Sequence, residues 1–127
     1  MSQSCFYLDS TVHGANSFAV WQDTGIDLAQ GEAVSFKVEG SASVLFKEDG
    51  PSLAAGPDGN GTQANNSLTP EFKIGTVVGR INGGAAFKIG AGTQTTAAEA
   101  GKLEIGFNDS LATDNKGGFF VGITVGT

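Results

Sequence analysis

The chain has 127 residues, of which 39% are hydrophobic and 16% charged, and its net charge is −6 at pH 7. This length suits one domain with one core, spanning residues 1–127. The acidic balance and the lack of a basic patch argue against nucleic acid as a partner. No apolar run approaches the roughly 18–20 residues of a membrane-spanning helix, so we expect no membrane insertion.

The N-terminal residues have neither a charged n-region nor an apolar h-region, so the sequence predicts no cleaved signal peptide. We expect a cytoplasmic protein or one exported without such a signal. Cys5 is the only cysteine, which rules out an intrachain disulfide. His13 is the only histidine and has no nucleophile near it in the sequence, so we expect no enzyme. A paired-carboxylate site among Glu71, Glu99 and Glu104 stays open as an alternative that nothing in the sequence favours.

Alternating apolar residues predict short β-strands along most of the chain, and no stretch has the spacing of an amphipathic helix. Residues 97–100 allow one helical turn at most. Turn residues recur roughly every ten positions, which favours an all-β fold built as a single jelly-roll-like β-sandwich. The expected strands are 14–21, 33–40, 43–46, 76–81, 85–89, 93–96, 103–107 and 119–125, with a hairpin turn at Asn82-Gly83-Gly84.

The longest stretch without alternation is 47–70, and long loops in compact domains are commonly functional. Within it, Gly56–Gly61 (GPDGNG) looks like the start of an EF-hand loop, but Thr69 stands where a bidentate Glu is required. We therefore predict a tight turn whose glycines adopt positive φ. Trp21 stands beside Val20, and we place it in the core.

A polar loop lies between the last two predicted strands. It crowds four oxygen-bearing side chains, and two of them, Asp109 and Asp114, would repel each other if nothing lay between them. Calcium removes such repulsion, because it takes about 6–8 oxygen ligands from carboxylates, amides, backbone carbonyls and water. A plain polar turn is the alternative, since turns use the same residues. The four side chains are Asn108, Asp109, Asp114 and Asn115.

Seven short motifs occur in order along the chain. They are W-x-x-T-G-I-x-L-x-x-G (21–31), V-x-F-x-V-x-G (34–40), GPDGNG (56–61), G-x-V-V-G-R-I (75–81), F-x-I-G (87–90), G-x-L-x-I-G-F-N-D (101–109) and D-N-x-G (114–117). This ordered set resembles the bacterial calcium-dependent galactose-binding lectins of the PA-I (LecA-like) type, together with related domains appended to glycoside hydrolases. The resemblance covers nearly the whole chain after about Gly14 and suggests a bacterial origin.

The resemblance implies a small β-sandwich with one calcium ion (Ca2+), whose shell is completed by hydroxyl groups of the sugar. By motif, the side-chain ligands would be Asp109, Asp114 and Asn115. Backbone carbonyl ligands would come from Ala112, Thr113 and Val44.

The same resemblance implies binding of galactosides or other glycans. The sugar would contact the three side-chain ligands together with amides of a second loop, Gln63, Asn65 and Asn66. In the resembled lectins a histidine of this second loop contacts the primary hydroxyl of the sugar, whereas residues 62–67 here contain no histidine. Asp114 also stands where those lectins have Asn. Because a single site of this kind is weak, we expect a homo-oligomer, a dimer or tetramer. A domain in which calcium only stabilises the loop, without binding sugar, is the alternative.

Overall fold

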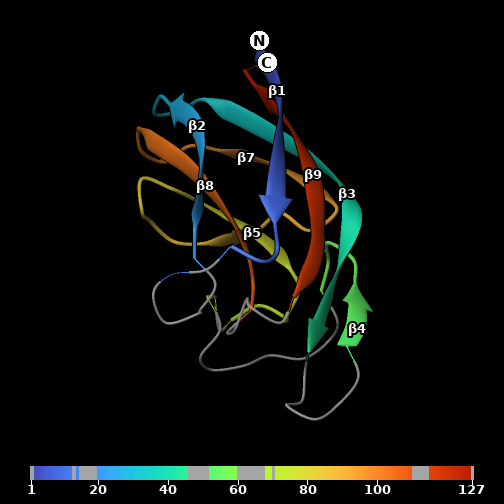
Figure 1. Cartoon of the computed structure of the whole chain (residues 1–127). Helices are drawn as coiled ribbons and strands as arrows, with labels where there is room; N and C mark the ends of the chain where they lie inside the picture. Colours follow the sequence, from blue (N-terminus) through green and yellow to red (C-terminus); the bar gives the residue numbers. More distant parts are fainter. Residues whose placement is uncertain are drawn as a thin grey trace.

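The computed structural model describes residues 2–12, 14, 20–45, 52–59, 68–69, 71–109 and 115–126, of which 43–45 and 52–55 are described by their backbone only. This part of the chain contains nine strands in two antiparallel sheets, which confirms the all-β sandwich (Figure 1). No helix long and apolar enough to cross a membrane occurs in it. The strands are β1 (Ser2–Asp9), β2 (Gln22–Leu28), β3 (Ala33–Leu45), β4 (Ser52–Ala55), β5 (Val77–Ile81), β6 (Phe87–Lys88), β7 (Gly92–Thr96), β8 (Gly101–Phe107) and β9 (Lys116–Val125).

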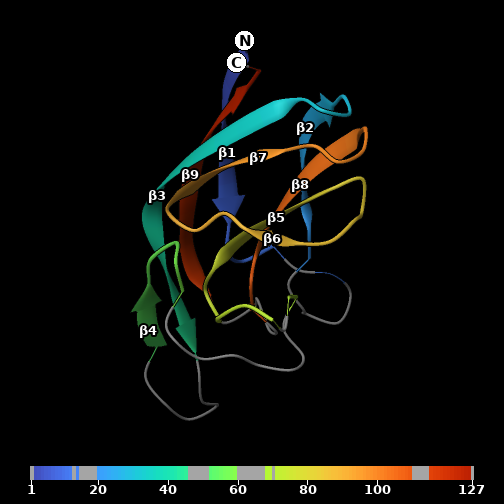
Figure 2. The same ribbon diagram turned by 180° about the vertical axis from the view of Figure 1, so that it is seen from behind.

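The first sheet has the order β1-β9-β3-β4, and β7 also pairs with β3. Its central strand, β9, pairs with β1 from Ser2↔Val125 onward and with β3 as far as Ser43↔Lys116. The second sheet has the order β2-β8-β5-β6; it lies behind the first sheet in Figure 1 and faces the viewer in Figure 2. Both chain ends lie at one end of the sandwich, and β8 finishes at the other (Figure 1).

The core lies between the sheets, where the inward residues of each strand meet. The ring of Phe107 on β8 stacks on that of Phe119 on β9, with centroids 5.8 Å apart. The rings of Phe36 on β3 and Phe87 on β6 also meet between the sheets, in a tilted arrangement with centroids 6.0 Å apart. Each fully buried apolar side chain contributes about 1.5–3 kcal/mol. Both aromatic contacts join the two sheets, and the Phe107–Phe119 contact lies on the two strands that flank the polar loop.

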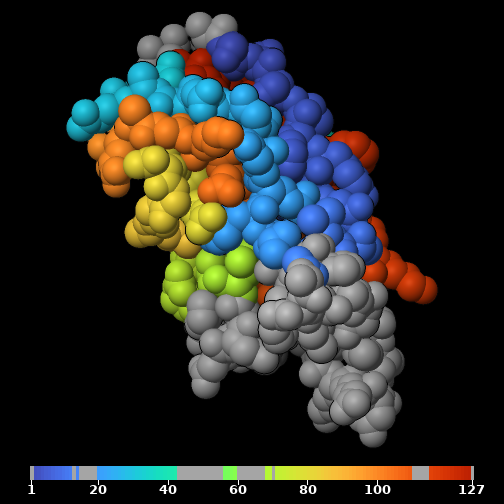
Figure 3. Space-filling model, turned by 60° about the vertical axis from the view of Figure 1, so that its left-hand side comes forward, coloured from blue at the N-terminus to red at the C-terminus, as the bar shows by residue number. Residues whose placement is uncertain are grey.

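One side of the sandwich is closed by β1 and β2, which belong to different sheets. The side-chain amide of Gln22 donates to the carbonyl of Asp9 at 2.9 Å. The two strands adjoin in the space-filling view, in dark and lighter blue (Figure 3). The predicted strand 14–21 is wrong at Gly14, Val20 and Trp21, because the strand begins only at Gln22.

Two further expectations about the strands differ from the structure. The first strand, β1, is absent from the predicted set, because only Phe6 and Leu8 of its residues are apolar and turned inward. Residues 43–45 of the predicted strand 43–46 are part of β3, which continues through Leu45, and residue 46 lies outside the described residues. The predicted turn at Asn82 is confirmed by its φ of 55°. In 56–61 a turn is confirmed by the hydrogen bond from the Gly59 N–H to the Gly56 carbonyl, and of the described glycines in this range only Gly59 has a positive φ, 83°.

Trp21 lies outside the core, contrary to expectation. It is half-buried on the outer surface of the second sheet, where its ring covers Gly106 of β8. The guanidinium carbon of Arg80 lies 4.7 Å from the centre of the ring. Arg80 also forms an ion pair with Glu104 at 2.9 Å. Glycine at 106 leaves room for the indole, so this aromatic ring stabilises the back of the sheet.

Candidate functional site

The polar loop joins the two sheets at the end opposite the chain termini. Its described flanks are Asn108 and Asp109, directly after β8, and Asn115, directly before β9. Strand β3 ends on the same side, as both ribbon views show (Figures 1 and 2). All three flanking side chains are buried. Buried amide and carboxylate groups at a strand end need partners, because an unsatisfied polar group costs about 1–3 kcal/mol.

Asn108 uses its amide group to hold the segment 68–73. It is completely buried, and its Oδ1 accepts the N–H of Thr69 at 2.7 Å. Its Nδ2 donates to the carbonyls of Phe72 and Lys73, both at 2.9 Å. The backbone carbonyl of Asn108 also accepts the N–H of Gly75 at 2.7 Å. Asn108 is therefore a structural residue at the border of the site.

Asp109 is 5% exposed, and its backbone carbonyl accepts the N–H of Leu68 at 3.2 Å. This bond, together with the one that the N–H of Thr69 donates to Asn108, holds the neighbouring Thr69 at the strand end. Thr69 is itself buried, and its hydroxyl is one of the buried groups that lack a hydrogen-bond partner in the described structure. Thr69 is not among the site residues expected from the sequence. No spacing or motif relates it to Asp109, which lies forty positions away in the chain.

Asn115 offers an oxygen from the other side of the loop. It is 4% exposed, and its Nδ2 donates to the carbonyl of Ser10 at 3.0 Å. Its Oδ1 is buried and has no hydrogen bond among the described groups. Ser10 is fixed in turn by a bond from its hydroxyl to the carbonyl of Gly117 at 2.6 Å. The amide of Asn115 is thus oriented by β1 and β9, with its oxygen available for another group.

Val44 lies beside Asn115 through the strand register. Ser43 pairs with Lys116, so Val44 and Asn115 are the next positions along the same antiparallel pair. On its other side Val44 pairs with Leu53 of β4. The structure therefore brings the backbone of Val44 and the side chains of Asp109 and Asn115 to one end of the sandwich. The other predicted site residues, Ala112, Thr113, Asp114, Gln63, Asn65 and Asn66, lie outside the described residues.

The donors at this end are oxygens, which suits a hard cation such as calcium. Within the described residues, no group of three or more His, Cys, Asp and Glu side chains could hold a metal ion. The predicted ligand set does not need such a group, because it relies on amide and carbonyl oxygens together with two carboxylates. One of these carboxylates is the buried Asp109. The described part of the set, Asp109 and Asn115 with the backbone carbonyl of Val44, carries oxygens of the kind that calcium binds, so it fits a calcium ion.

The carboxylates of the alternative glycosidase site have structural partners. Glu104 is paired with Arg80 on the second sheet, and Glu99 accepts a hydrogen bond from the side chain of Asn82 at 3.0 Å. Glu71 is exposed in the segment between Thr69 and β5. These contacts hold the first two glutamates on separate partners, so their arrangement does not support paired acid and base groups.

Comparison with known proteins identifies the fold. No protein-family model matches the chain, and no curated protein matches it. Among solved structures the chain is similar to one described as "EclA N-terminal domain; PllA-like lectin", with a TM-score of 0.64 and 19% sequence identity. The similarity covers 95% of this chain and 94% of the other. At this identity the likeness shows the fold, a β-sandwich of the kind found in a lectin.

Proposed function

We propose that the protein is a calcium-dependent carbohydrate-binding lectin for galactosides, in which sugar hydroxyls coordinate the bound calcium. It would act as a binding protein and carry out no reaction. The observation that carries the proposal is a pair of buried oxygen-bearing groups on the two flanks of the loop. The carboxylate of Asp109 lies on one flank and Oδ1 of Asn115 on the other, and this Oδ1 receives no hydrogen bond from the described groups. The lectin fold of the structural neighbour supports the same conclusion.

The calcium ligands would be Asp109, Asp114 and Asn115 through their side chains and Val44, Ala112 and Thr113 through their carbonyls. A bound calcium supplies coordination positions at which hydroxyl groups replace water. Asp109 contributes charge in a buried setting, where electrostatic attraction is stronger than in water. Asn115 contributes an oxygen whose direction is set by its bond to Ser10. The carboxylates would also accept hydrogen bonds from the same sugar hydroxyls, and such charge-assisted bonds are the stronger ones.

The Thr69 hydroxyl is a further candidate for this site, either as a ligand or as a contact to the sugar. Its position is fixed by the hydrogen bond from its N–H to Asn108. The amides of Gln63, Asn65 and Asn66 would contact the periphery of the sugar. Because residues 62–67 lack the histidine of the resembled lectins, the preference among sugars would depend on these amides.

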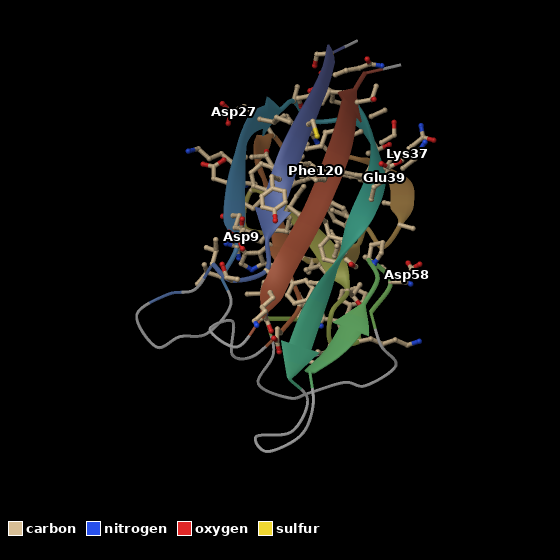
Figure 4. The ribbon with its side chains drawn as sticks, turned by 45° about the vertical axis from the view of Figure 1, so that its right-hand side comes forward. Asp9, Asp27, Lys37, Glu39, Asp58 and Phe120 are labelled. Atoms are coloured by element: carbon tan, nitrogen blue, oxygen red, sulfur yellow. The ribbon has the colours of Figure 1, made fainter. Side chains whose placement is uncertain are left out.

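The first experiment measures calcium binding. We expect calcium to raise the melting temperature, because binding to the native state alone stabilises by about 2.7 kcal/mol at one hundred times Kd. Asp109→Asn should abolish this shift while leaving the melting temperature in chelator close to that of the wild type. Asp27→Asn is the matched control, since Asp27 is exposed on β2 at the far end of the sandwich (Figure 4). A wild-type melting temperature that does not depend on calcium contradicts the metal site.

The second experiment measures sugar binding by titration calorimetry, with galactosides first and other sugars next. The calcium-loaded wild type should bind, and both chelator and Asp109→Asn should remove binding. Gln63→Ala and Asn65→Ala should keep the calcium shift and weaken sugar binding. One lost hydrogen bond is worth about 0.5–1.5 kcal/mol, which corresponds to a few-fold to about tenfold in affinity. Calcium binding without binding of any sugar on a broad glycan panel favours the alternative, a calcium-stabilised structural or interaction domain.

A further inference from the structure

The outward face of the first sheet carries two exposed aromatic side chains. Phe120 on β9 is 58% exposed and Tyr7 on β1 is 46% exposed. Their ring centroids are 5.0 Å apart. Large exposed apolar groups that adjoin each other are typical of interaction surfaces. The ring of Tyr7 also covers Gly118, where a Cβ atom would have no room, so the pair is supported from below.

Two rows of outward residues define this surface, which we call the aromatic face. The strand register places Tyr7, Phe120 and Glu39 in one row. The next outward row along the strands holds Cys5, Gly122 and Lys37. Phe120, Lys37 and Glu39 are seen together on this side of the molecule in Figure 4.

The second row forms a hollow beside the aromatic pair. A shallow depression of about 210 Å³ is lined by Cys5, Lys37, Glu39, Phe120 and Gly122. It adjoins another of about 330 Å³, with which it shares Lys37 and Gly122. The surface is recessed at Gly122 because glycine has no side chain. The face therefore presents a projecting ring in one row and a hollow in the next.

Each of the two rows on the aromatic face also carries one charged side chain. Lys37 and Glu39 are both exposed and stand two residues apart on β3, so they point the same way. Neither takes part in an ion pair among the described residues, whereas the other sheet pairs Arg80 with Glu104. One positive and one negative group thus stand in neighbouring rows without an ion-pair partner among the described residues.

We propose that the aromatic face binds the aromatic face of a second copy of this chain, as a two-fold symmetric dimer. The two-fold axis lies between the two copies, runs perpendicular to the strands and passes midway between the two rows. It therefore places the first row of one copy opposite the second row of the other. Phe120 of each copy then faces Gly122 of the other, and Lys37 faces Glu39. Such an interface is self-complementary, because every contact occurs twice. Sheets packed in this way lie about 10 Å apart, a spacing at which a projecting ring fills a hollow.

The charge pairing gives a specific test. Lys37→Glu would place a negative charge opposite Glu39 of the second copy, and Glu39→Lys would place a positive charge opposite Lys37. Because like charges repel, each variant alone should dimerise at least about tenfold more weakly than the wild type. An equimolar mixture of the two variants should form a heterodimer, because both facing pairs then have opposite signs. The double variant should also recover self-association. Analytical ultracentrifugation measures all four samples. Asp27→Lys, on the other sheet, is the matched control and should dimerise like the wild type.

The hollow gives a second test that does not depend on charge. Gly122→Leu fills the hollow, and the structure tolerates the change, since an added Cβ meets only the carbonyl of Lys37 at 3.5 Å. We expect a monomer with an unchanged melting temperature at low protein concentration. Cys5, the single exposed thiol, reports on the same surface. Its reaction with a thiol reagent should slow as the wild-type protein is concentrated, and it should stay fast in Gly122→Leu.

Two results would overturn the proposal. One is a wild type that remains monomeric at high micromolar concentration. The other is a dimer that survives both Gly122→Leu and the single charge reversals, which would point to another surface such as the free edge of β1. Failure of sugar or calcium binding would leave the proposal unaffected, because the aromatic face shares no residue with the candidate site.

Discussion

Replacing Asn108 by alanine should cost more stability than any exposed substitution, because its amide holds the segment 68–73 to the end of β8. The change removes three side-chain hydrogen bonds, to Thr69, Phe72 and Lys73. Each is worth about 0.5–1.5 kcal/mol net, so their loss amounts to roughly 1.5–4.5 kcal/mol. The buried N–H of Thr69 is left without its acceptor, which places the expected cost near 3 kcal/mol. Loss of apolar contact adds little, because Asn buries few apolar atoms.

Urea denaturation followed by tryptophan fluorescence measures this cost in the presence of chelator. About 3 kcal/mol is a large share of the 5–15 kcal/mol of a typical domain. At roughly 3–5 °C per kcal/mol for a chain of this size, the melting temperature should fall by about 10–15 °C. Gln94→Ala, at an exposed position of β7, is the control and should stay within about 0.5 kcal/mol of the wild type. A change at Asn108 no larger than that of the control would refute the assigned role.

Asn108→Asp separates hydrogen bonding from shape. The acid keeps the acceptor for Thr69 but turns an oxygen toward two carbonyls, to which Asn108 donates. At neutral pH it should be at least as destabilising as alanine. Burial and the two carbonyls raise the pKa of the new carboxyl, and its protonated form can donate to one of them. The deficit relative to wild type should therefore shrink as the pH falls.

Two further predictions concern the strands. The pKa of Asp23 is lowered below 3.8, mainly by the hydrogen bond from the Gly25 N–H and then by the Lys102 ammonium group. Asp23→Asn should therefore lower the free energy of unfolding above pH 3.8. The difference from the wild type should disappear as the pH falls through the lowered pKa. Urea titrations at several pH values test this, and a difference that persists in acid would contradict it. Gly40→Ala should cost about 1–3 kcal/mol, because Gly40 has φ 121° and an added Cβ would meet the carbonyl of Gly118. Gly25→Ala is its control, since it has positive φ but open space, and equal costs would argue against the steric contribution.

The sandwich is largely predictable from the sequence, for a physical reason. Strands such as β3 and β8 alternate apolar and polar residues because one side of each faces the core. β1 escapes detection because its outward positions carry Cys5 and Tyr7, which blur the contrast with Phe6 and Leu8. Alternation detects a strand only when its outer residues are polar, and the outer residues of β1 form part of the aromatic face.

The candidate site is less predictable at the level of single residues. Asn108 and Asp109 are adjacent and chemically similar, and both are buried, yet the amide of Asn108 is fully used by the segment 68–73. The partners of Asn108 lie more than thirty positions away in the chain, so no local spacing could reveal them. Thr69 escapes for the same reason. The residue types that suit a cation are visible in the sequence, whereas the division between supporting and binding residues depends on long-range contacts.

The central place of β9 has a consequence for how the chain folds during synthesis. β9 pairs with both β1 and β3, and it follows all the other described strands in chain order. Among the described strands of the first sheet β1 neighbours only β9, so its ladder can form only after residues 116–125 have been synthesised. Pairings this distant in sequence close slowly. Until then the nascent chain exposes the unpaired edges of β1 and β3, and exposed strand edges favour aggregation.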